Sequence, residues 1–70
     1  MSDRRDAITL ETIERLIRET EADICRQEVI IKELQQDGRP AVGAVTLLRL
    51  LESDLASYRK VLEYHRRPQN

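Results

Sequence analysis

The amino-acid sequence predicts an all-α fold, an antiparallel two-helix hairpin with coiled-coil-like packing. Two segments each carry apolar residues at alternating spacings of three and four, which is the heptad pattern of paired helices. A short Asp-Gly-Arg-Pro segment at 37–40 separates them, and a glycine followed by a proline ends a helix. The composition agrees, because 36% of the residues are charged and only 3% are aromatic, a balance typical of long helices.

The first predicted helix spans residues 9–37. Thr9 is a suitable N-cap because its hydroxyl can accept a backbone N–H of the first turn, where Glu11 favours the helix dipole. Gly38 then supplies the left-handed residue that closes many helices. The seam of this helix consists of eight positions: Leu10, Ile13, Ile17, Thr20, Ile24, Gln27, Ile31 and Leu34.

The second predicted helix spans residues 41–67, after a turn at 38–40. Its seam consists of Ala41, Ala44, Leu48, Leu51, Leu55, Tyr58, Leu62 and His65. So short a connection forces the two helices to run antiparallel. Small residues at Ala41, Gly43 and Ala44 predict that the helices approach closely beside the turn. Residues 1–8 are expected to be a frayed N-terminal segment, and residues 68–70 a C-terminal tail.

A chain of 70 residues buries so little apolar surface that its stability is marginal without a disulfide, a metal or a partner. Cys25 is the only cysteine, so an internal disulfide is excluded, and with His65 as the only histidine no structural zinc site is expected. No cofactor motif is present either. Association with another protein chain is the stabilising interaction that remains.

Apolar residues outside the two seams predict where that association takes place. They form a second stripe made of Leu16, Ile30, Leu47, Leu50, Val61 and Tyr64, with Val29 further round the first helix. Two hairpins related by a two-fold axis would cover this stripe as a four-helix bundle, so a homodimer is the first expectation. Docking of the stripe onto a larger protein partner, and a monomeric hairpin, are the alternatives.

Four conspicuous residues each have a structural interpretation. Gln27 is a polar residue in a seam, where an amide fixes register and oligomeric state, so it is predicted to be a specificity element. Tyr58 is interpreted as an aromatic filler opposite Thr20, and His65 as a helix-end histidine. Redox sensing by Cys25 would need a lowered thiol pKa and a resolving thiol, for which Arg26 alone is thin support.

The sequence predicts a non-enzymatic interaction module or small regulator in the cytoplasm. Catalysis needs groups that converge in a water-excluding pocket, and a rod of two helices offers none. No segment is apolar enough to span a membrane. A small RNA- or DNA-binding hairpin dimer is the alternative function, because the open end gathers eight basic residues against six acidic ones. Nucleic acid is nevertheless not the expected partner, since the net charge is −1 and aromatic platforms for base stacking are lacking.

Several residues in the middle half of the chain also carry a resemblance. They are the Arg-Gln-Glu run at 26–28, then Ile31, Leu34, Asp37-Gly38, the leucine-rich stretch 44–55 and Arg59. These residues resemble a group of short, uncharacterised alphaproteobacterial proteins. That group tends to have a threonine after the turn where this chain has Ala41. The resemblance implies a helical hairpin of bacterial, cytoplasmic origin, and it brings no activity with it.

Overall fold

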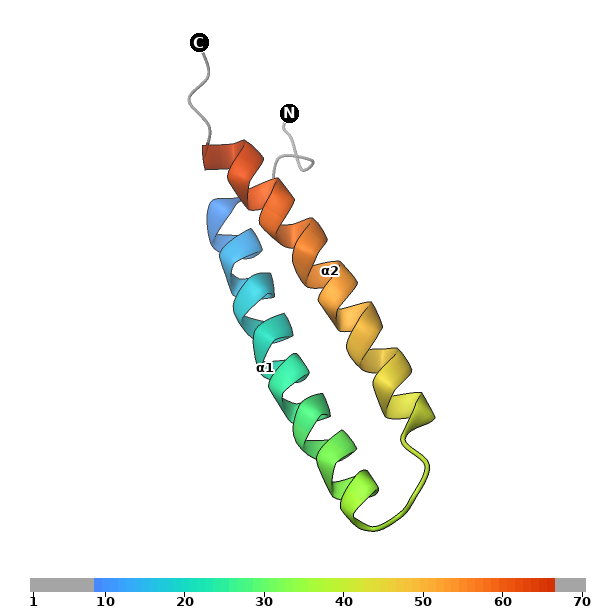
Figure 1. Ribbon diagram of the computed structural model, residues 1–70. Coiled ribbons are helices and arrows are strands. Elements are labelled where there is room, and N and C mark those ends of the chain that lie inside the picture. The colour runs from blue at the N-terminus through green and yellow to red at the C-terminus, as the bar shows by residue number, and fades with distance from the viewer. Residues whose placement is uncertain (1–8, 67–70) are drawn as a thin grey trace, which may run out of the picture.

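The computed structural model describes residues 9–66, which form two α-helices folded into one antiparallel hairpin (Figure 1). Helix α1 spans Leu10–Gln36 and helix α2 spans Val42–Arg66. The two helices make extensive contacts with each other, and the all-α hairpin predicted from the heptad pattern is thereby confirmed. The expectations of a frayed segment at 1–8, a tail at 68–70 and a helix end at residue 67 fall outside the described residues.

Both ends of α1 have the caps that the sequence predicts. The side chain of Thr9 accepts the backbone N–H of Thr12 at 3.2 Å, which satisfies one donor of the first turn. At the other end Gly38 has a φ of +68°, a conformation that glycine adopts without steric penalty. The N–H groups of Gly38 and Arg39 bond back to the carbonyls of Gln35 and Leu34, so a Schellman motif closes the helix.

Helix α2 begins without a side-chain cap. Ala41 precedes its first residue, and the carbonyl of Ala41 accepts the N–H of Val45 at 2.9 Å as the first helical hydrogen bond. An alanine at this position leaves the donors of the first turn without a side-chain acceptor, which costs about 0.5–2 kcal/mol relative to serine or aspartate. Pro40 lies before the cap and belongs to the connection between the helices.

The predicted seams are the surfaces that the helices turn toward each other. Ile13, Thr20 and Leu55 are buried, and the other seam positions are half-buried except the two at the ends, Leu10 and His65, which are exposed. Such partial burial is expected of two helices alone, because each covers only one stripe of the other. The hairpin therefore has a line of contact between its helices rather than an enclosed core.

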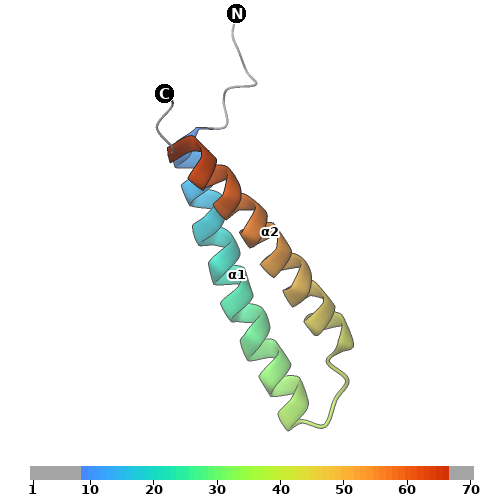
Figure 2. The same ribbon diagram turned by 45° about the horizontal axis from the view of Figure 1, so that its top comes forward.

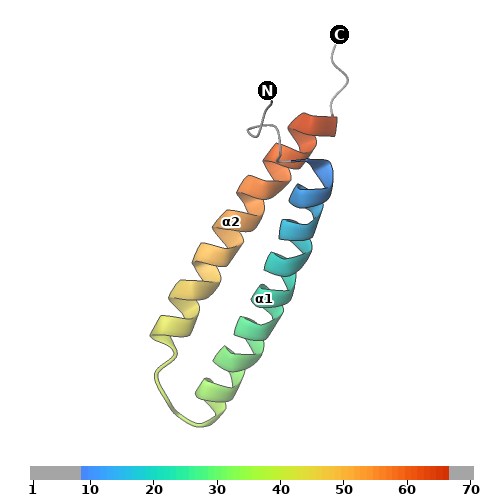
Figure 3. The same ribbon diagram turned by 180° about the vertical axis from the view of Figure 1, so that it is seen from behind.

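The turn end is wider than the sequence predicts. The two helices lie close together near the chain termini and diverge toward the connection, as all three views of the ribbon show (Figures 1, 2 and 3). A Cβ built on Gly43 would meet nothing within 4 Å, so this glycine does not mediate close helix contact. The expectation of a narrow turn end was wrong, because the capped end of α1 and the extended approach that Pro40 imposes hold the helix ends apart.

Candidate protein-interaction face

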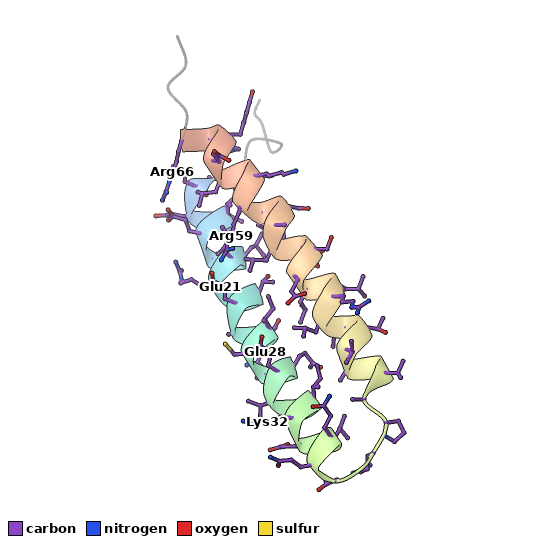
Figure 4. The ribbon with its side chains drawn as sticks, viewed as in Figure 1. Glu21, Glu28, Lys32, Arg59 and Arg66 are labelled. Atoms are coloured by element: carbon purple, nitrogen blue, oxygen red, sulfur yellow. The ribbon has the colours of Figure 1, made fainter. Side chains whose placement is uncertain are left out.

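One side of the hairpin is closed by ion pairs between the helices. Arg59 of α2 donates to Glu21 of α1 at 2.9 Å, and Arg66 donates to Glu14 at 3.2 Å (Figure 4). All four residues directly follow the second seam position of a heptad, so they share one flank of the seam. We call Glu14, Glu21, Arg59 and Arg66 the charged side.

These two pairs also fix the register of the hairpin. A step of seven residues along α1, from Glu14 to Glu21, moves the partner seven residues back along α2, from Arg66 to Arg59. The same register gives, for any residue of α1, the residue of α2 that lies level with it. Leu16 lies within one turn of the height of Val61 and Tyr64, and Ile30 within one turn of Leu47 and Leu50.

The opposite flank of the seam carries the predicted interface residues. Leu16, Ile30, Leu47 and Val61 each directly precede a first seam position, which places them across the seam from the charged side. Leu50 and Tyr64 lie next to them, one step farther from the seam. We call this set the apolar face: Leu16, Ile30, Leu47, Leu50, Val61 and Tyr64.

The apolar face is largely open to solvent. Leu16 is half-buried, whereas Leu50 is 59% exposed and Tyr64 68% exposed, and the remaining three residues are about two-fifths exposed. Val29 and Val42, which lie farther round the two helices, are exposed as well. Large apolar side chains gathered on one flank and open to water are typical of a surface that another protein covers.

Two aspartates interrupt the apolar face at its middle. Asp23 and Asp54 also directly precede a first seam position, like Leu16 and Ile30 on α1 and Leu47 and Val61 on α2, and each lies at the midpoint of its helix. Asp23 accepts an ion pair from Arg26 of its own helix. Asp54 is exposed and has no ion pair within residues 9–66. The face thus consists of an apolar layer near each end and an acidic layer between them.

A shallow hollow lies beside the acidic layer on α1. It has a volume of about 330 Å³ and is lined by Cys25, Arg26, Val29 and Ile30. The aliphatic part of the arginine side chain supplies one wall, and the guanidinium points to Asp23. This hollow is wide open to solvent, whereas a small-molecule site buries most of the surface of its ligand.

The other residues singled out in the sequence are spread over the hairpin. Gln27 and Tyr58 are half-buried in the seam, as their heptad positions predict. His65 is exposed, and its Nδ1 lies 3.0 Å from the carbonyl of Val61 on the preceding turn, in reach of a hydrogen bond. Cys25 is an exposed free thiol. No two of these four side chains are joined by a hydrogen bond in the structure of residues 9–66.

The cross-helix ion pairs were not predicted from the sequence, although the sequence contains the signal for them. The glutamates of α1 and the arginines of α2 recur every seven residues at the same heptad position, and antiparallel helices bring equal positions together. On the sequence alone, Arg59 and Arg66 are two of the eight basic residues of the open end. In the structure Arg59 and Arg66 are instead paired with glutamates.

Within the described residues no group of three or more metal-binding side chains gathers, and neither α1 nor α2 is long and apolar enough to cross a bilayer. Comparison of the chain with models of protein families, with curated proteins and with solved structures finds no match. The resemblance to short alphaproteobacterial proteins therefore stays a prediction, and function has to be argued from the hairpin itself.

Proposed function

We propose that this protein is a non-enzymatic interaction module whose first partner is a second copy of itself. The observation that carries the proposal is the apolar face, which gathers six large apolar side chains on one flank of the hairpin while ion pairs close the other flank. Two hairpins that pack through this face make a four-helix bundle.

Burial energetics support self-association. Within residues 9–66 only Ile13, Thr20 and Leu55 are buried, and large apolar side chains such as Leu47 and Leu50 remain open to water. Covering a large apolar side chain is worth up to roughly 1.5–3 kcal/mol, and several such terms on each copy offset the entropic cost of association. A second copy supplies an equal face without any further protein, which makes the homodimer the simplest solution.

The nucleic-acid alternative receives less support. Binding to a phosphate backbone relies on arginines and lysines that are free to exchange their counterions. Arg59 and Arg66, which stand at the open end, are each engaged with a glutamate, and Arg15 is 4.0 Å from Glu19. An RNA or DNA ligand would have to compete with these carboxylates, so weak and strongly salt-dependent binding is the most it would achieve.

Sedimentation equilibrium tests the proposal. We expect a mass of about 16 kDa at micromolar concentration, twice the 8.2 kDa of one chain. Leu47→Asp should return the protein to the monomer, because it places a charge in the apolar face. Thr46→Asp is the matched control, since Thr46 is an exposed neighbour outside that face. A helical monomer for the unaltered chain would contradict self-association and favour a larger protein partner.

A further inference from the structure

We propose that two copies pack through their apolar faces with their turns at the same end, and that Arg26 of each copy binds Asp54 of the other. This arrangement rests on the proposed self-association and specifies its geometry. The two-fold axis runs along the length of the bundle, so α1 of one copy lies against α2 of the second copy.

Two symmetric ways of pairing the apolar faces are available. A two-fold axis along the bundle keeps the turns together and sets α1 against α2 of the other copy. An axis across the bundle places the turns at opposite ends and sets each helix against its own equivalent. In both arrangements the acidic layer of one copy, formed by Asp23 and Asp54, must lie against the acidic layer of the other copy. Only then do the apolar layers of the two copies cover each other.

Charge separates the two arrangements. With the axis across the bundle, Asp54 meets Asp54 of the second copy, and like charges face each other without a base on either α2 at that height. With the axis along the bundle, Asp54 meets the layer of α1 that contains Arg26. Arg26 is five residues beyond Glu21, and Asp54 is five residues before Arg59, so the register set by the Glu21–Arg59 pair puts them at one height.

Arg26 is able to hold two carboxylates at once. A guanidinium has five N–H donors, and the contact with Asp23 is made by Nη2 alone. The remaining donors are available for the aspartate of the second copy, which has no ion pair in its own chain within residues 9–66. Unpaired aspartates would be unfavourable in a buried interface. In this arrangement each Asp54 is instead paired with Arg26 of the other copy, so two contacts connect the copies.

The shape of the apolar face also favours the axis along the bundle. The hollow beside Ile30 lies at the height of Leu50 in the register of the hairpin. With α1 against α2 of the second copy, Leu50 of that copy stands over the hollow and fills it. With the axis across the bundle the hollow would instead face α1 of the second copy, whose residues at the mirrored height include the charged Asp23 and Arg26.

Charge reversal tests the contact. Arg26→Glu and Asp54→Lys should each raise the dimer Kd roughly tenfold, because every dimer loses two ion pairs and gains two repulsions. The double variant should recover to within about threefold of the unaltered Kd, since the charges are exchanged. Lys32→Glu, on the other flank of α1 (Figure 4), is the matched control and should not be rescued by Asp54→Lys.

A distance measurement tests the orientation independently of these variants. With Cys25→Ser and Arg39→Cys, a spin label at each turn should give one distance below about 25 Å, because the turns are adjacent. A distance above about 40 Å, one helix length, would overturn the arrangement while leaving self-association intact. Additive losses in the double variant would overturn the Arg26 to Asp54 contact. A monomeric mass would contradict the proposed function itself.

Discussion

The two halves of the hairpin use the same heptad pattern and reach different degrees of packing. The open half, residues 9–24 and 55–66, contains Ile13, Thr20 and Leu55, the only buried side chains within residues 9–66, together with both cross-helix ion pairs. The turn half, residues 25–54, contains seam residues that are at best half-buried. A heptad pattern therefore decides which residues face each other and leaves the distance between the helices undecided.

Two local features account for the difference. The connection holds the helix ends apart at the turn, as Figure 3 shows. The series of cross-helix ion pairs also stops in the turn half. The next pair of positions toward the turn, seven residues after Glu21 and seven before Arg59, holds Glu28 and Glu52, which are both acidic. The turn half thus lacks the cross-helix attraction of the open half, and it leaves more apolar surface for a partner to cover.

Truncating one leucine in each half should give the largest contrast. Leu55→Ala is expected to lower the free energy of unfolding by about 2–3 kcal/mol, because Leu55 is 9% exposed and the cavity cannot close easily. Leu48→Ala should cost about 1 kcal/mol, since Leu48 is only half-buried. Urea unfolding followed by circular dichroism, at one protein concentration, measures both. Equal losses would mean that the turn half is packed as tightly as the open half.

A substitution at Gln27, a seam residue of the turn half, should stabilise that half. Gln27→Leu should raise the free energy of unfolding by about 1 kcal/mol, because a leucine buries apolar area that the amide does not. The same change should loosen the register or the stoichiometry, if the amide is a specificity element. Thermal melts combined with mass measurement separate these effects. A clear loss of stability would instead place Gln27 in a satisfied polar network, and a search for its partner would follow.

Completing the ladder of ion pairs should have the smallest effect. Glu52→Arg places a cation opposite Glu28, which is labelled in Figure 4, and should stabilise the hairpin by about 0.5 kcal/mol, a typical value for exposed pairs. Ser53→Arg adds the same charge one residue away and serves as the control. Thermal unfolding at low salt is the measurement, since screening weakens the pair. No difference between the two variants would show that the helices are too far apart there to interact.

Much of the fold could be predicted because its signals are local. Thr9, Gly38 and the seam residues act through their own turn or their own heptad, and the structure has them in the predicted roles. The positions of the apolar face follow from the same period. The spread of the turn half could not be predicted, because it depends on the backbone angles of the connection, which residue spacing does not specify. To predict the cross-helix ion pairs one must know how the two helices align, and the sequence of neither helix alone specifies that alignment.

Arg66 and Glu14 show that α1 begins where α2 ends, so a pull on both chain ends acts on one end of the rod. In that geometry tension opens the layers one after another, as in a zipper, rather than shearing them all at once. The first layers to bear the load contain Ile13 and the Glu14 to Arg66 pair, in the better packed half. The mechanical resistance of the hairpin is thereby concentrated at its open end, and the turn half would separate under less force once that end had parted.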